Sequence, residues 1–250
     1  MITSLRSLRA AGVAAALLAT LAVGAPAAAA HSAHHDNPNP ALFAPDAHPF
    51  GASMATWAER ASRWVYGHPL DRNPLFDQTG ANCDVAQQGP VWYIARIAGP
   101  LVFSGTRHCA IPKQKSLFLY IGAVVDEYPC APFPAFHPAP GQSLYDFLRA
   151  DAAPIMDKVN LLQVTIDSRP MRDVIADYRY HSEKLFSIRF DPSLKDPLGD
   201  PCITGTRQPA IVDGFFMMVK PLSRGEHTIV VHGTATSGDD KTFTYYLTMR

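Results

Sequence analysis

The segment 77–125 constrains the fold most, because it holds three strand-like runs and two cysteines within 49 positions. Residues 91–97, 101–104 and 117–125 are largely apolar or aromatic, and Gly and Pro separate the first two runs. Such runs between turn residues are typical of β-strands. The run 117–125 is apolar on both faces apart from Gly122, which indicates a central strand covered on each side.

The C-terminal half adds strands of a second kind. Apolar and polar side chains alternate over residues 162–167, 186–190 and 242–249, so that one face is buried and the other is wet. Further apolar runs cover 214–220 and 228–231. Only two helices are expected: one at 53–66, and one that begins at the capping box of Ser143 and Asp146 and that Pro154 ends or restarts. We therefore expect eight strands in a mainly β fold, an antiparallel two-sheet sandwich that is jelly-roll-like and has two short helices.

The N-terminus predicts export. Arg6 and Arg9 precede an apolar stretch at 11–23, and small residues follow at 26–30, as in a secretory signal peptide of residues 1–30. Residues 31–50 contain four prolines and predict a flexible or extended leader that lies over the domain. Residues 51–250 then form a single β-sandwich domain. We expect a secreted or periplasmic protein with no membrane span after signal cleavage.

Charge excludes two classes of partner. Removal of Arg6 and Arg9 leaves 20 basic side chains against 22 acidic ones. Such a balance gives no reason to expect nucleic acid or an anionic membrane surface as a partner.

Four cysteines in an exported chain predict two disulfides, with three possible connectivities. A hairpin over residues 91–105 would bring Cys83 and Cys109 together, which favours that pair. Cys130 and Cys202 would then pair by elimination. Zinc is the alternative, but the spacings contain no C-x-x-C pair.

Two metal sites compete with simpler interpretations, and no cofactor is expected. The stretch 71–84 is rich in oxygen donors, which suit calcium or a turn that binds its own backbone; these are Asp71, Asn73, Asp77, Thr79, Asn82 and Asp84. Leu75 at the third ligand position excludes an EF-hand. His31 would be a copper ligand if cleavage follows Ala30, with His34 and His35 nearby; the alternative is a polar spacer.

No catalytic motif is present, and the remaining candidates are scattered. Asp126 and Glu127 end the central run and could form a paired acid and base. Four histidines could be bases or metal ligands, or separate surface residues: His108, His181, His227 and His232. Three tryptophans, Trp57, Trp64 and Trp92, fit either the core or a sugar-stacking surface.

Several longer strings resemble a group of uncharacterised secreted bacterial proteins. The strings are TGANC, AQQGPVWYIA, GTRHCAIPKQKSLFLYIGAVV and IVDGFFMMVKPLSRGEHTIVVHG. The group has segments of the type D-x-TG-x-x-C, Q-x-G-P-V-W-F and P-L-x-x-G-x-H-T-I. Gln114 stands where that pattern has glycine, and His108 where it has a small polar residue. The resemblance implies export and the β fold, and it adds no catalytic residue because the group has no known activity.

Two functions of different classes are therefore expected. The first is an extracellular or periplasmic binding or structural module, held by two disulfides, that presents loops or an aromatic face to a glycan or peptide. The alternative is a secreted hydrolase or metal-dependent enzyme on the same scaffold, since sandwiches support many chemistries.

Overall fold

The computed structural model describes residues 37–98 and 102–250, and residues 37–250 form one compact unit. The expected signal peptide, the first part of the leader and the copper candidates His31, His34 and His35 lie outside the described residues. The described part contains ten strands, four α-helices and three short 3-10 helices, at Pro49–Gly51, Leu70–Arg72 and Pro192–Leu194. None of its helices combines the length and the apolar character that a membrane crossing requires.

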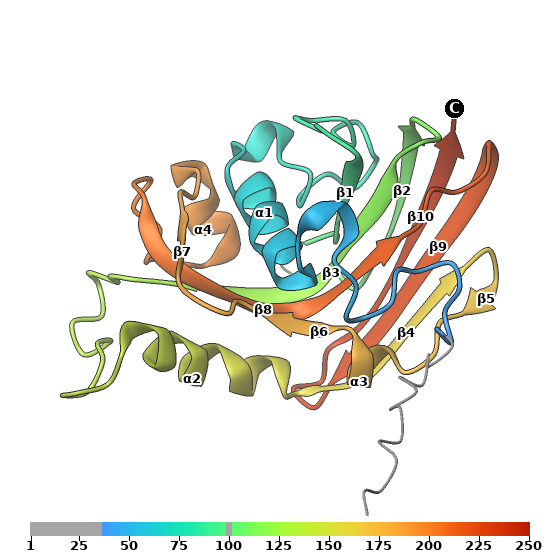
Figure 1. The fold of residues 1–250 in the computed structure, drawn as a ribbon. Coiled ribbons are helices and arrows are strands. Elements are labelled where there is room, and N and C mark those ends of the chain that lie inside the picture. Colours follow the sequence, from blue (N-terminus) through green and yellow to red (C-terminus); the bar gives the residue numbers. More distant parts are fainter. Residues whose placement is uncertain (1–36, 99–101) are drawn as a thin grey trace, which may run out of the picture. The chain divides into compact units, whose positions relative to one another are not determined.

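The strands form two five-stranded sheets (Figure 1). The first sheet has the order β1 (Val91–Ala95), β3 (Ser116–Glu127), β8 (Gln208–Val219) and β6 (Arg179–His181), with β7 (Phe186–Ile188) also paired to β8. The second sheet has the order β2 (Ser104–Ile111), β10 (Asp240–Met249), β9 (Gly225–Ala235), β4 (Val159–Ile166) and β5 (Arg169–Pro170). The expected mainly β, two-sheet sandwich is thus confirmed.

The sheets are mixed, whereas antiparallel, jelly-roll-like sheets were expected. β1 pairs in parallel with β3, and β2 pairs in parallel with β10. The expected hairpin over 91–105 is wrong, because β1 and β2 belong to different sheets. The chain leaves the first sheet after β1, forms β2 in the second sheet and returns as β3. A crossover of this kind permits parallel pairing, which a tight hairpin does not.

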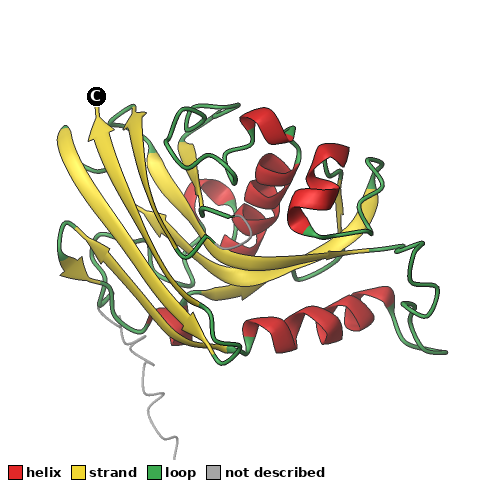
Figure 2. Ribbon diagram, turned by 180° about the vertical axis from the view of Figure 1, so that it is seen from behind, coloured by secondary structure: helices red, strands yellow, loops and turns green. Residues whose placement is uncertain are grey.

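Three layers bury the central strands β3 and β8. Phe118 and Phe216 point toward α1 (Met54–Tyr66), while Leu119 and Met217 point toward the second sheet. Farther along the same strands, α2 (Leu144–Met156) packs on Ile211. The two helices lie on opposite faces of the first sheet (Figures 1 and 2). β3 is therefore the covered central strand that its apolar run predicted.

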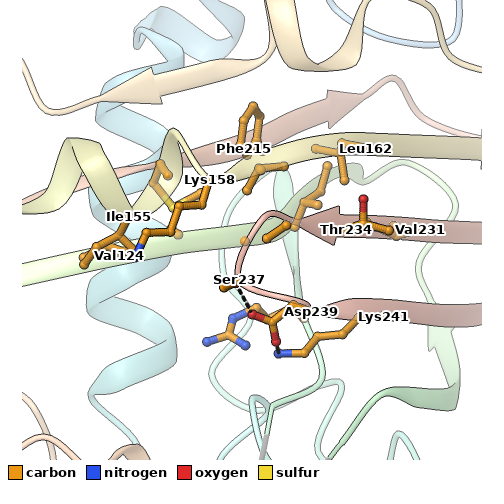
Figure 3. A pocket seen from close by; sticks show the side chains of 18 of the residues that line it. Val124, Ile155, Lys158, Leu162, Phe215, Val231, Thr234, Ser237, Asp239 and Lys241 are labelled. Carbon is orange, nitrogen blue, oxygen red and sulfur yellow. Dashed lines mark hydrogen bonds and ion pairs between the residues drawn. The ribbon is translucent and has the colours of Figure 1, made fainter.

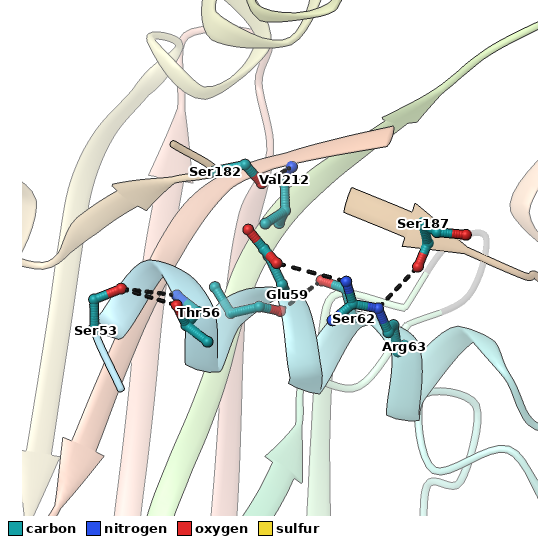
Figure 4. A network of polar contacts seen from close by, with 9 residues as sticks. Ser53, Thr56, Glu59, Ser62, Arg63, Ser182, Ser187 and Val212 are labelled. Carbon is teal, nitrogen blue, oxygen red and sulfur yellow. Dashed lines mark hydrogen bonds and ion pairs between the residues drawn. The ribbon is translucent and has the colours of Figure 1, made fainter. Parts of the chain in front are cut away.

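The predicted helices are confirmed, and short ones are added. The Ser53 hydroxyl accepts from the Thr56 amide and starts α1, and the Arg63 guanidinium donates to the Ser187 carbonyl, which ties α1 to β7 (Figure 4). Ser143 caps α2 as expected. Pro154 lies inside α2, and the helix ends two residues beyond it, at Met156. The additional helices are α3 (Val174–Asp177) and α4 (Lys195–Leu198).

The described part of the expected leader packs on the sandwich. Leu42 is fully buried and forms a bridge with Val219 at the end of β8. The Asn39 amide donates to the Tyr178 hydroxyl, and the Arg172 amide donates back to Asn39. Residues 37–50 are therefore held to the domain by hydrogen bonds as well as by burial.

Both expected disulfides are present. Cys83 pairs with Cys109 on β2, and Cys130 pairs with Cys202. The first pairing is right although the hairpin that suggested it does not form: the loop before β1 lies along β2, where the His108 amide donates to the Thr79 carbonyl.

Candidate functional site

A pocket of about 320 Å³ opens where the second sheet and the end of α2 meet over the first sheet (Figure 3). β3 and β8 contribute its floor, including Val124 and Phe215. The end of α2 and the start of β4 contribute one wall, and β9, β10 and the turn between them contribute the other. Most of the lining is apolar, and Ile155 at its rim is 47% exposed. The site thus combines the two sheets and α2, whereas α1 covers the other face of the first sheet.

A bulge in β3 opens the floor of this pocket. The register with β8 shifts between Tyr120 and Gly122, and Gly122 pairs with Phe215. A Cβ added to Gly122 would meet no atom within 4 Å, so this position leaves space that a side chain could fill. A Cβ on Gly214 would lie 2.4 Å from the Ala123 Cβ, so the close approach of the two strands requires glycine there. Bulges of this kind bend a strand and often lie next to binding sites.

Three basic side chains and one acidic side chain line the pocket. The Lys241 ammonium lies 3.0 Å from the Asp239 carboxylate, and the Ser237 hydroxyl donates to the same carboxylate (Figure 3). The hydrogen bond from Lys241 holds the pKa of Asp239 below its usual value. Lys158 has no ion pair within 4.0 Å among the residues that the structure describes. With Arg96, the lining has an excess of two positive charges.

Arg96 directly follows the last residue of β1, and a hydrogen bond fixes the backbone next to it. The buried Arg107 guanidinium donates to the carbonyl of Ala95, with a nitrogen–oxygen distance of 2.7 Å, and so fixes the backbone next to Arg96. The Nε atom of Arg96 is buried, and it has no hydrogen-bond partner among the described residues. A buried donor without a partner is costly, which marks Arg96 as an unsatisfied group at the pocket.

The expected carboxylate pair does not form one site. Asp126 and Glu127 are successive strand residues, so their side chains leave opposite faces of the first sheet. Burial, together with Asp151 on α2, raises the pKa of Asp126 to about 7. Burial and the neighbouring Asp200 raise the pKa of Glu127 to about 9. Asp200 also raises the pKa of Asp126, but the two side chains leave opposite faces of the sheet and do not converge on a common substrate position.

The four candidate histidines are dispersed. His108 stacks on Tyr246, with ring centroids 5.0 Å apart, and His181 is exposed at the end of β6. His232 lies 3.0 Å from Asp240, and His227 lies 2.7 Å from Asp167. Within residues 37–98 and 102–250, no three His, Cys, Asp or Glu side chains come together as metal ligands.

One histidine has the partners of a catalytic triad, although it is arranged to hold a turn. The Nδ1 atom of His227 lies 2.7 Å from the Asp167 carboxylate, and its Nε2 atom lies 3.3 Å from the Ser223 hydroxyl. The same Nε2 atom lies 3.0 Å from the carbonyl oxygen of Ser223, which can only accept. The ring therefore contacts the backbone of this turn as well as the Ser223 hydroxyl, which supports a role in holding the turn. The sequence alone did not indicate this cluster, since Asp167 is 60 residues away from His227.

Side chains in the stretch 71–84 form hydrogen bonds with the backbone. The Asp77 carboxylate accepts from the amides of Thr79, Gly80 and Asn82. Burial alone would raise the pKa of Asp77, but these hydrogen bonds outweigh it and hold the pKa below its usual value. The Asn73 side chain is buried and donates to the carbonyls of Val65 and His68. Asp71 is exposed, so these residues do not form one cage.

The three tryptophans belong to the core. The indole of Trp57 donates to the Pro49 carbonyl, and that of Trp64 donates to the Val85 carbonyl. Trp92 is 7% exposed and lies between the sheets. Their burial favours the core interpretation over a sugar-stacking surface.

Comparisons with known proteins leave the family open. No protein-family model matches the chain, and no curated protein sequence matches it. Among solved structures, a cysteine protease inhibitor from Entamoeba histolytica is 12% identical, with a TM-score of 0.20, over 60% of this chain and 88% of its own. The solution structure of amebosin is 12% identical, with a TM-score of 0.18, over 61% of this chain and all of its own. Similarity at this level carries no conclusion about function, which is therefore inferred from the pocket itself.

Proposed function

We propose that this protein is a secreted binding module that holds a small, largely apolar ligand in the pocket between α2 and the two sheets. The observation that carries the proposal is the preformed, mostly apolar pocket of about 320 Å³. Ligand sites in proteins are typically concave and apolar with a few polar groups, and their volumes begin at roughly 300 Å³. Two disulfides support export, because such bonds persist in oxidising compartments.

The floor of the pocket contains space that the chain itself does not fill, whereas protein interiors are otherwise close-packed. Gly122 leaves unfilled space at the floor of the pocket, and a larger side chain there would close part of it. The position thus sacrifices packing, which supports an occupant other than the chain itself.

The test adds a side chain to the floor. Gly122→Leu should fill the pocket, while Thr244→Val, on the outer face of β10, adds apolar surface to the same domain without lining the pocket. The probe is N-phenyl-1-naphthylamine, a neutral apolar dye whose fluorescence rises when it leaves water. The disulfide-bonded wild-type domain should bind it saturably at one site, Thr244→Val should bind it equally, and Gly122→Leu should bind it at least tenfold more weakly. A folded Gly122→Leu variant with unchanged binding would show that the pocket is not the site.

A further inference from the structure

The charges at the pocket are more specific than an apolar ligand requires. The lining contains Arg96, Lys158 and Lys241 against Asp239 alone. Lys241 and Asp239 neutralise each other at 3.0 Å. The remaining cations, Arg96 and Lys158, therefore border an apolar hollow without a counter-charge among its lining residues. Placing positive charge beside apolar surface favours a ligand with an apolar tail and a negative head.

Arg96 is the better placed of these cations to receive the head. Its Nε atom is buried and unpartnered among the residues that the structure describes, whereas Lys158 is exposed. A guanidinium offers parallel N–H donors that match the two oxygens of a carboxylate or phosphate, and such bidentate pairs are strong when desolvated. The Arg96 side chain as a whole is half-buried and lines the pocket, so an anionic head there would give its guanidinium an acceptor. Lys158 follows the end of α2 and lies beside Ile155 and Val124, where its charge adds attraction at the rim (Figure 3).

The backbone next to Arg96 is held in place in the ligand-free protein. Arg107 is 2% exposed and donates to the carbonyls of Asp77, Ala95 and Pro74. The Ala95 carbonyl belongs to the residue directly before Arg96, so the backbone that carries Arg96 loses little freedom on binding. Preorganisation of this kind increases affinity because less ordering occurs during binding.

We infer that the ligand of this pocket is an amphiphilic anion with a single apolar tail, whose head pairs with Arg96 and whose tail lies over the bulge of β3. The inference rests on the proposed function, since it names the chemical class that the same pocket binds. A carboxylate and a phosphate monoester share the required chemistry, and the experiment below separates them.

The experiment compares ligands that differ only in the head. Decanoate, decyl phosphate, 1-decanol and decylammonium displace N-phenyl-1-naphthylamine from the disulfide-bonded domain at neutral pH. Wild-type protein should bind decanoate or decyl phosphate at least about tenfold more tightly than 1-decanol, and decylammonium most weakly; tenfold is the size expected of one modest charge-assisted contact. The better of the two anions identifies the head group.

Variants then assign the head to Arg96. Arg96→Gln should bring the affinity for the anion down to that for 1-decanol, while leaving 1-decanol binding unchanged. Arg96→Lys should retain part of the preference, and Lys158→Gln should reduce it less than Arg96→Gln does. Arg224→Gln is the matched control, because it removes an exposed positive charge just before the other end of β9. It should behave as wild type.

The outcomes separate the two proposals. Equal binding of 1-decanol and both anions by wild-type protein would overturn the anion inference and leave the binding function intact. A preference for anions that persists in Arg96→Gln would overturn the assignment of the head to Arg96. If Arg96→Gln does not fold, a reduced preference in Arg96→Lys, which keeps the same charge, supports the bidentate contact, and full retention contradicts it. Failure of the neutral dye to bind wild-type protein would instead reject the pocket as a ligand site.

Discussion

Arg107 and Arg96 are both arginines with a buried guanidinium nitrogen, but they differ in whether that nitrogen has hydrogen-bond partners. The guanidinium of Arg107 is 2% exposed and donates to three backbone carbonyls, which closes the space between β2 and the loop before β1. The Nε atom of Arg96 is also buried but has no partner among the described residues, and other parts of the residue line a pocket. A satisfied buried cation stabilises a fold, whereas an unsatisfied one at a cavity is available to a ligand. We call the region around Arg107, between β2 and the loop before β1, the closed side of the sandwich, and the pocket beside Arg96 its open side.

The largest expected loss of stability follows from a substitution on the closed side. Arg107→Met removes the donors of three buried carbonyls, those of Pro74, Asp77 and Ala95. Each buried acceptor left without a partner costs about 1–3 kcal/mol, so the free energy of unfolding should fall by about 3 kcal/mol or more. Urea unfolding followed by circular dichroism measures this loss. Arg96→Gln is the matched comparison and should cost less than about 1 kcal/mol; an equal loss in both variants would remove the distinction between the two sides.

The disulfides provide the next largest effect, and Cys83–Cys109 is the one that lies on the closed side. Cys83–Cys109 ties the loop near Arg107 to β2, and Cys130–Cys202 joins the segments that follow β3 and precede β8. Removing either pair by double substitution to alanine should cost about 2–4 kcal/mol. The separation of 72 residues for Cys130–Cys202 exceeds the 26 residues for Cys83–Cys109, so the chain-entropy account predicts a cost higher by about 1 kcal/mol. Urea unfolding of the two double variants measures the difference, and a reversed order would show that native contacts outweigh loop length.

The closed side was predictable from the sequence, and the open side was not. The run 117–125 predicted a covered central strand because apolar character on both faces is a local signal. The even cysteine count predicted the disulfides, although the hairpin invoked for Cys83–Cys109 does not form. The pocket forms where the second sheet ends and α2 begins to cover the first sheet. These segments are far apart in the sequence, so no local pattern predicts the pocket. Arg96 lies inside the strand-like run 91–97, where nothing in the sequence distinguished it, and the bulge at Gly122 gave only the weak signal of a glycine within an apolar run.

A smaller effect concerns a second buried polar group without a partner among the described residues, which lies outside the pocket lining. Glu127 is 2% exposed, and burial with Asp200 nearby raises its pKa to about 9. The folded state thus binds the proton more tightly than the unfolded state, whose carboxyl has a pKa near 4.5. This stabilisation is complete below about pH 4.5 and is lost as the pH rises toward about 9. Asp126, with a pKa of about 7, adds a similar slope at lower pH, so the window between about pH 7.5 and 9 isolates Glu127.

Glu127→Gln keeps the shape of the neutral side chain and removes its titration. The melting temperature of wild-type protein should fall between pH 7.5 and 9, whereas that of Glu127→Gln should fall less steeply. Glu226→Gln, an exposed change on β9, serves as the control and should follow the wild-type curve. Differential scanning calorimetry measures all three. Identical slopes in Glu127→Gln and wild type would mean that Glu127 is ionised in the folded protein.

The smallest expected effect tests whether His227 holds a turn or activates Ser223. Burial would raise the pKa of Asp167, but the hydrogen bonds from His227 and the Thr228 amide hold it below its usual value. A lowered carboxyl pKa contributes stability above the unfolded value, near 4, and that stability is lost as the pH falls through the folded value. Because the pair is partly exposed, Asp167→Asn should lower the free energy of unfolding at neutral pH by at most about 1 kcal/mol, and the loss should vanish at acidic pH. Ser223→Ala should leave stability unchanged, since the contact that holds the turn uses the Ser223 carbonyl. Hydrolysis of an acyl ester by wild-type protein that disappears in Ser223→Ala would instead show that the hydroxyl, and not the carbonyl, is the functional partner of His227.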